Sequence, residues 1–142
     1  MLKKAAVLSG VLWVVGCGSP TINVVDPLAV VNWSPHDGAT CIDPDWPGLT
    51  LSVCLSQALD PASAGSNVSL QTVDAAGAPA GAVSATVALA SGDAACAQLT
   101  GFTLDPDTEY AIVLASALAA EDGTELGHQL ISRFRTRDAS CP

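Results

Sequence analysis

Positive charge is scarce in this sequence. Its five basic residues stand against 14 aspartate and glutamate residues, and they are Lys3, Lys4, Arg133, Arg135 and Arg137. Without the two N-terminal lysines, three arginines face fourteen acidic residues, which gives a formal charge of −11. Such a surface would be repelled by phosphate backbones, so nucleic acid is not an expected partner. No lysine would then remain for Schiff-base chemistry.

Catalytic patterns are absent as well. The two histidines, His36 and His128, lie far apart in stretches typical of loops. The sequence has no H-E-x-x-H, G-x-S-x-G or P-loop pattern and no dinucleotide-binding fingerprint. No serine has an evident base beside it, although a hydrolytic site needs a nucleophile, a base and a group that orients the base. We therefore expect a protein that is not an enzyme and that uses no cofactor.

The apolar run at the N-terminus is too short to span a membrane. It extends from Ala5 to Val15, whereas a membrane-spanning helix needs roughly 20 residues. Because it follows two lysines, it has the form of a secretory signal peptide. It ends in "VVGC" at residues 14–17, which resembles the signal of bacterial lipoproteins, whose cysteine thiol is nucleophilic enough to take a lipid. The alternative is an ordinary signal peptide with a chance cysteine.

The lipoprotein resemblance implies a division of the chain. Residues 1–16 are the cleaved signal peptide, and residues 17–28 are the lipidated Cys17, carrying palmitate or a similar lipid, and a tether of at most about 35 Å. Residues 29–142 form the body, which is long enough for one domain. Two or three acyl chains anchor a protein stably, and Gly18 in place of aspartate resembles lipoproteins that move on to the outer membrane. The expected location is the bacterial cell envelope, lipid-anchored at the outer membrane.

Four further cysteines lie in the body, at Cys41, Cys54, Cys96 and Cys141. None belongs to a close C-x2-C pair of the kind that zinc sites prefer. Disulfides form and persist in exported proteins. The four cysteines therefore predict two disulfides, with three possible pairings.

The body has the pattern of an all-β domain. Short runs of alternating apolar and polar residues are separated by turn residues such as Gly, Pro and Asp. Seven strands are expected, at residues 29–33, 49–55, 68–73, 83–89, 95–100, 110–114 and 130–136. This number and spacing favour a sandwich. The stretch 111–126 is rich in Ala, Leu and Glu, which favour helix, so a single helical turn around residues 118–120 is the alternative there.

Several short motifs follow one another along the body. A first strand ends in Ser34-Pro35 before a glycine turn, and a later strand leads into "LDP" at residues 59–61. Then come "LDPDTEYAIVL" at 104–114, "EDGTELG" at 121–127 and "FRT" at 134–136. In this order they resemble bacterial Ig-like domains of the surface-layer-protein type, with departures at the four cysteines and at Leu55, where the family has phenylalanine. The resemblance covers residues 30–138 and implies a seven-stranded Ig-like Greek-key β-sandwich.

The implied sandwich also selects among the cysteine pairings. In it, the loop that holds Cys41 and the chain end that holds Cys141 share one pole, while Cys54 and Cys96 lie in neighbouring antiparallel strands. The resemblance therefore implies the disulfides Cys41–Cys141 and Cys54–Cys96. Tyr110 stands just after a turn, in the setting of a tyrosine corner, where the ring is buried and the hydroxyl bonds to nearby backbone.

Two Asp-Pro-Asp triplets and one tryptophan are the candidate site residues. The triplets place possible Ca²⁺ ligands at the pole away from the tether, namely Asp43, Asp45, Asp105 and Asp107. Asp and Pro are also ordinary turn residues, so we expect turns there and no metal. Trp46, in the first of these loops, either anchors a partner or a sugar or covers the end of the core. Trp33 is expected in the core.

Three arginines alternate along the last expected strand, at Arg133, Arg135 and Arg137, and so face one side of it. They suit a lipid phosphate or an acidic partner. The reading we favour is that they discourage edge-to-edge aggregation of an exposed strand.

Together these features predict a non-catalytic envelope lipoprotein with an Ig-like domain. Its partners would be the membrane, through the lipid anchor, and an envelope protein or glycan, in a structural or adhesive role. The alternative is a ligand-binding envelope module that takes a carbohydrate or Ca²⁺ at the loops far from the tether.

Overall fold

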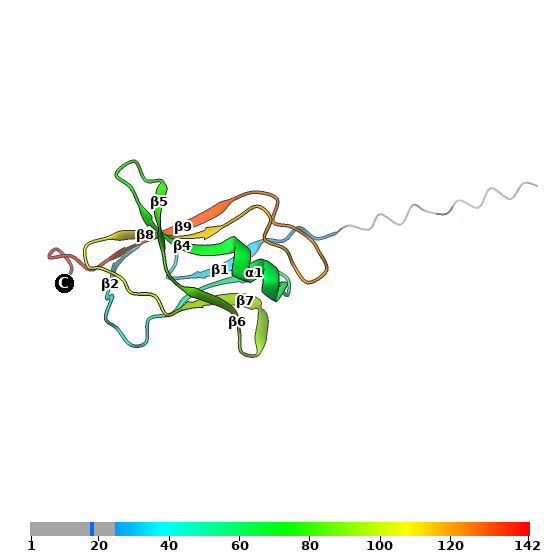
Figure 1. Cartoon of the computed structure of the whole chain (residues 1–142), viewed down its shortest axis with the longest axis horizontal. Helices are drawn as coiled ribbons and strands as arrows, with labels where there is room; N and C mark the ends of the chain where they lie inside the picture. The colour runs from blue at the N-terminus through cyan, green and yellow to red at the C-terminus, as the bar shows by residue number, and fades with distance from the viewer. Residues whose placement is uncertain (1–17, 19–24) are drawn as a thin grey trace, which may run out of the picture.

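The computed structural model of the chain describes residue 18 and residues 25–142. The expected signal peptide and the lipidation site at Cys17 lie outside the described residues. Within the described part, the chain forms nine strands and one short helix (Figure 1). None of the helices described there is long and apolar enough to cross a membrane.

Two β-sheets pack as a sandwich. The first has the strand order β1-β3-β7-β6, with β1 at Val30–Ser34, β3 at Leu51–Leu55, β7 at Asp93–Thr100 and β6 at Thr86–Ala90. The second has the order β2-β9-β8-β4-β5, with β2 at Ala39–Ile42, β9 at Leu130–Thr136, β8 at Glu109–Leu114, β4 at Val68–Val73 and β5 at Pro79–Val83. Neighbouring strands are antiparallel except for β2 and β9, which run parallel.

The seven expected strands are all present, with ends shifted by up to three residues, but the described part holds two more. The additional strands are β2 and β5, which lie between the strands that the sequence predicts. β2 forms because the chain leaves the first sheet after Ser34 and pairs with the distant β9, where Ala39 lies opposite Phe134. β5 begins at Pro79 and is an edge strand, a position where proline is tolerated because the missing N–H need not pair.

The alternative of a helical turn at residues 118–120 is not what the chain forms. Leu118 and Ala120 are buried while Ala119 between them is less so, which is the period of an extended segment. Isolated bridges join Leu59 to Ala120 and Ala119 to Glu125. The described helix is instead α1, Pro61–Asn67, which begins at a proline and buries Ala64.

The core lies between the two sheets. Alternate residues of each strand point inward, as in Leu51, Val53 and Leu55 of β3, and the same sets on β4, β7, β8 and β9 are buried. Tyr110 is one of them, 2% exposed, and its ring stacks on Phe134 with centroids 5.7 Å apart. The N–H of Asp105 donates to the Tyr110 hydroxyl at 2.7 Å, so Tyr110 has the contacts expected of a tyrosine corner.

The four body cysteines form two disulfides, in the pairs that the strand order implied. Cys41 is bonded to Cys141 with Cα atoms 5.6 Å apart. Cys54 is bonded to Cys96, with Cα atoms 4.0 Å apart, and these two residues lie directly opposite each other on β3 and β7. One disulfide therefore fastens the chain end to the start of the body, and the other staples two adjacent strands of one sheet.

Candidate functional site

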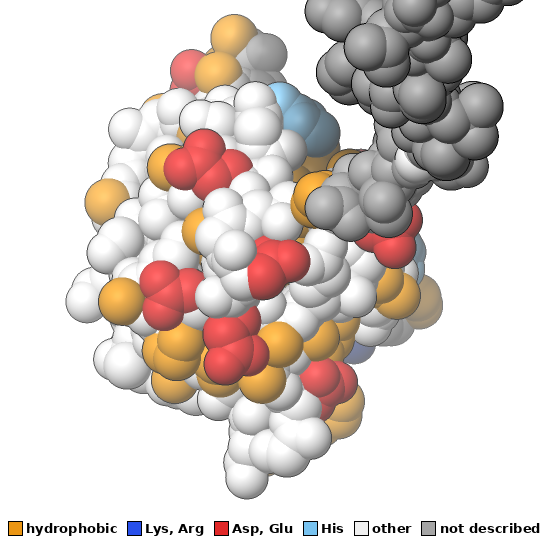
Figure 2. Space-filling model, turned by 90° about the vertical axis from the view of Figure 1, so that its right-hand side faces the viewer, with side chains coloured by type: hydrophobic (Ala, Val, Ile, Leu, Met, Phe, Trp, Pro, Cys, Tyr) orange, Lys and Arg blue, Asp and Glu red, His pale blue; other side chains and the backbone are white. Residues whose placement is uncertain are grey.

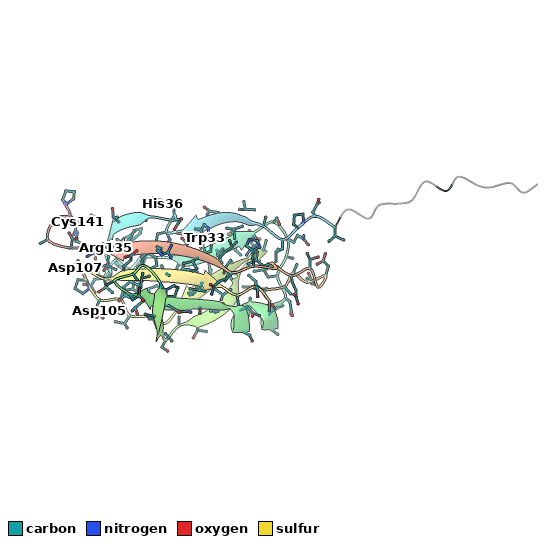
Figure 3. The ribbon with its side chains drawn as sticks, turned by 90° about the horizontal axis from the view of Figure 1, so that it is seen from above. Trp33, His36, Asp105, Asp107, Arg135 and Cys141 are labelled. Atoms are coloured by element: carbon teal, nitrogen blue, oxygen red, sulfur yellow. A yellow bond between two sulfur atoms is a disulfide. The ribbon has the colours of Figure 1, made fainter. Side chains whose placement is uncertain are left out.

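One end of the molecule gathers most of the candidate residues. The described chain enters at the opposite end (Figure 1), and the strand directions place four segments at the far end: residues 43–50, 74–78, 101–108 and 137–142. We call these segments the distal pole. Figure 3 shows Asp105, Asp107, Arg135 and Cys141 there.

The distal pole carries a groove with an aromatic side chain at its rim. Trp33, Ile42 and Leu49 line it while packing against the core. Trp46 also lines it and is 59% exposed. The volume is about 460 Å³, within the range of small-ligand sites. We call this surface the tryptophan groove, defined by residues 32–36, 42, 46 and 48–50.

The loop that presents Trp46 is held in place by its own hydrogen bonds. The N–H of Asp45 donates to the Asp43 carboxylate at 3.0 Å, the N–H of Trp46 to the Asp43 carbonyl at 3.3 Å, and the N–H of Leu49 to the Trp46 carbonyl at 2.9 Å. The indole lies directly over Gly48, where an added Cβ would come within 2.8 Å of the ring. Glycine is therefore required at residue 48 for the ring to lie where it does.

The four candidate calcium ligands are not gathered into one cluster. Asp43 caps its own turn, as described above, and Asp107, at φ 50°, forms an ion pair with Arg135. Among residues 18 and 25–142, no group of three or more His, Cys, Asp or Glu side chains lies close enough to hold a metal ion. Both triplets therefore act as turns, since Asp45 and Asp105 also lie in loop segments.

The arginines of β9 do not guard a sheet edge. β9 lies between β2 and β8, so the favoured reading of Arg133, Arg135 and Arg137 as edge protection is wrong. The sequence could not show this, because β2 pairs with β9 across about 90 residues of chain, and local sequence patterns do not reveal such a pairing. The arginines face outward and fasten loops of the distal pole to the sheet instead.

Each arginine has its own partner. Arg133 donates from Nε and Nη2 to the Gly77 carbonyl, at 2.9 and 2.6 Å, and Arg137 donates to the Pro142 carbonyl at 2.9 Å. The hydrogen bond and ion pair with Asp107 raise the pKa of Arg135 above its ordinary value.

The C-terminal turn beside Arg135 is held by Asp138. The Ser140 hydroxyl and backbone N–H both donate to the Asp138 carboxylate. These bonds favour the charged carboxylate, so they lower the pKa of Asp138. The turn carries Cys141 and thereby the disulfide to Cys41.

A second, polar cleft of about 610 Å³ lies between residues 73–77, residues 107–109 and Arg135. Its charged residues are Asp74, Asp107, Glu109 and Arg135. Arg135 and Asp107 satisfy each other across it, so their charges are compensated within the chain. The cleft therefore offers fewer unpaired groups to a charged ligand, and the tryptophan groove is the better candidate for a binding site.

Some of these residues lie where the sequence predicts, and others do not. Trp46 is exposed, as the first of its two alternatives requires. Trp33 is half-buried and lines the groove as well as the core, and His36 also lines the groove. His128 is exposed in the β8–β9 connection, at the other end of the molecule. The groove was missed because residues 32–36 and 46–50 meet only in the folded chain.

Comparison with known proteins gives the fold and no family. No protein-family model matches the chain, and no curated protein matches it. Among solved structures, native alpha-2-macroglobulin of E. coli matches 80% of this chain at 19% identity with a TM-score of 0.55. Domains 1–6 of the surface layer protein SbsC match 78% at 19% identity with a TM-score of 0.52.

These neighbours are much longer than this chain. The matches span 6% of the macroglobulin and 14% of the SbsC fragment. A shorter E. coli macroglobulin structure, spanning domains MG0-NIE-MG1, is matched over 33% of its length. The likeness therefore shows a β-sandwich of the kind found as one part of large bacterial proteins.

Proposed function

We propose that this chain is a non-catalytic domain of the bacterial cell envelope, held to the outer membrane by a lipid on Cys17, whose distal pole makes structural or adhesive contacts. The observation that carries the proposal is Trp46, exposed on a loop held by its own hydrogen bonds at the end opposite the N-terminal entry of the body. Exposed tryptophans at such places commonly anchor partners.

The fold supports an extracytoplasmic role. Its solved neighbours belong to a surface layer protein and to a macroglobulin, and the two disulfides suit an oxidising compartment. The strand orders β1-β3-β7-β6 and β2-β9-β8-β4-β5 support an Ig-like Greek-key arrangement, extended by β2 and β5 beyond the seven strands of the simplest form.

The geometry of attachment supports presentation of the distal pole outward. A tether over residues 18–28 reaches about 35 Å at most, and Leu28 at its end is buried in the core, so the near end of the body would face the membrane. Figure 2 views that near end and shows acidic side chains spread over it among apolar ones. Residues 43–50 lie at the other end and would point away from the lipid surface.

A ligand-binding module at the distal loops is the second candidate. Its calcium version has little support, because Asp43 and Asp107 are engaged in a turn and in an ion pair. Its carbohydrate version is supported by the tryptophan groove.

Replacement of the lipidation site tests the anchor. The full chain expressed in a bacterium fed radioactive palmitate should carry the label and sediment with membranes, and so should a Ser19→Ala control. Cys17→Ser should lose the label and move to the soluble fraction, because the proposed lipid is attached to this thiol and supplies the membrane affinity. Unchanged sedimentation of Cys17→Ser with membranes would contradict the lipid anchor.

A further inference from the structure

We propose that the tryptophan groove binds a neutral oligosaccharide, with one pyranose ring against the Trp46 indole. This inference rests on the proposed function in one respect, namely that the distal pole is the surface presented to partners. It names the chemistry of the partner, which the proposed function leaves open.

The side chains of the groove match the two surfaces of a sugar ring. A pyranose has a flat face of C–H groups and an edge of hydroxyls. The groove offers apolar surface from Trp33, Trp46 and Leu49, and large aromatic rings supply such contact area at low entropic cost. Its polar lining residues are Asn32, Ser34, His36 and Thr50, which together offer hydrogen-bond donors and acceptors, although the Ser34 hydroxyl already donates to the Thr50 carbonyl. A volume of about 460 Å³ accommodates a small ligand.

The charges favour a neutral ligand. None of the residues that line the groove is Asp, Glu, Lys or Arg, so it offers no ion pair to a charged sugar. Asp43 and Asp45 lie in the adjoining loop, and the chain as a whole carries a formal net charge of −9. An acidic sugar would therefore meet repulsion with nothing to offset it.

The groove is preorganised. The backbone turns at residues 43–49 fix the loop, the disulfide at Cys41 fixes its start, and Gly48 lets the ring of Trp46 lie on the backbone. The loop therefore needs little further ordering when a ligand binds, and this lowers the entropic cost of binding. A solvent-facing indole on a mobile loop would lack this advantage.

The two tryptophans of the body provide the measurement. Of the three tryptophans in the chain, Trp13 lies in the expected leader, and Trp33 and Trp46 both line the groove. In the full chain carrying Trp13→Phe, tryptophan fluorescence therefore reports on the groove alone. Cellotriose and triacetylchitotriose are the neutral probes, trigalacturonate is the acidic probe, and N-acetyl-Leu-Ala-Leu-amide is the peptide probe.

We expect saturable fluorescence changes with at least one neutral probe, with Kd on the order of 0.1–1 mM because only one or two rings fit. Trp46→Ala should weaken that binding about tenfold or more, which is roughly 1.4 kcal/mol. Gly48→Ala should weaken it as well, because the new Cβ displaces the indole. Val31→Ala, which removes an exposed apolar side chain of β1 that does not line the groove, should bind like the parent. Thermal melts show whether each variant is folded.

Three results would overturn the proposal: no saturable change with either neutral probe, trigalacturonate bound as tightly as they are, or equal affinity in folded Trp46→Ala. Binding of the peptide probe in place of the sugars would assign the groove to a protein partner instead. The titration needs no lipid, so its failure leaves the anchor intact, whereas failure of the Cys17→Ser experiment leaves sugar binding intact.

Discussion

Two buried hydroxyls on β9 show how much a single side chain depends on its partners. Ser132 and Thr136 are both fully buried and point into the core. Thr136 Oγ1 accepts from the Thr108 N–H at 2.9 Å and contacts the Asp105 carbonyl at 2.7 Å, so it ties the β7–β8 loop to the sheet. The Ser132 hydroxyl has no partner within the described residues. A buried hydroxyl that makes no hydrogen bond destabilises the folded state, whereas one that makes two hydrogen bonds stabilises it.

These two positions should respond to loss of the hydroxyl with opposite signs. Ser132→Ala should raise the free energy of unfolding by about 1 kcal/mol, because an unsatisfied polar group leaves the core. Thr136→Val should lower it by about 1–3 kcal/mol, because the Thr108 N–H loses its acceptor. Urea unfolding followed by tryptophan fluorescence measures both. A destabilised Ser132→Ala would mean that its hydroxyl has a partner in solution.

Among the elements, the β4–β5 hairpin depends on a strand with which it does not pair. Its turn at residues 74–78 is closed by Asp74, whose carboxylate accepts from the Ala76 and Ala78 N–H groups, each at 2.9 Å. The Arg133 side chain of β9 then holds the Gly77 carbonyl with two nitrogens. We call this contact between Arg133 and Gly77 the clasp. Because β8 and β4 lie between β9 and β5 in the sheet, the clasp crosses the outer face of both strands.

Loss of the clasp should loosen the turn and leave the core unchanged. Arg133→Met keeps the aliphatic stem, so we expect exchange of the Gly77 and Ala78 amides to accelerate roughly tenfold, the effect of losing a charged hydrogen bond on local opening. Arg135→Met, which breaks the ion pair with Asp107, is the matched control and should leave these amides unaffected. Hydrogen exchange followed by NMR measures both, and equal protection in Arg133→Met and the parent would refute the clasp.

At the scale of the whole molecule, the two disulfides close loops of different length. Cys41 and Cys141 are separated by 100 residues, and Cys54 and Cys96 by 42. The first bond spans nearly the entire body and fixes the loop that carries Trp46. In the chain-entropy account, the longer loop restricts the unfolded chain more.

Removal of either disulfide should therefore be costly, and removal of the longer one slightly more so. The variant Cys41→Ala/Cys141→Ala should lose roughly 4–5 kcal/mol of unfolding free energy, and Cys54→Ala/Cys96→Ala roughly 4 kcal/mol. Urea unfolding of both variants beside the parent provides the values. A loss below about 1 kcal/mol for the first pair would show that the unfolded chain does not gain the freedom assumed in the entropic account.

The sequence by itself determined where most strands lie. Alternation of apolar and polar residues is a property of neighbours, so Leu51, Val53 and Leu55 reveal β3 without knowledge of the fold. The position of Tyr110 after a turn likewise predicted its contacts. The cysteine pairing needed the strand order as well, and that order came from a resemblance between motifs.

The tertiary structure alone decided the rest, because the remaining features depend on residues far apart in the chain. β2 exists through its pairing with β9, and without β2 the arginines of β9 would lie at an edge. Trp46 could be recognised as a candidate from its loop, but its exposure depends on how that loop folds over Gly48. The tryptophan groove forms only when residues 32–36 and 46–50 come together in the folded chain, and local sequence patterns do not predict contacts between segments that far apart.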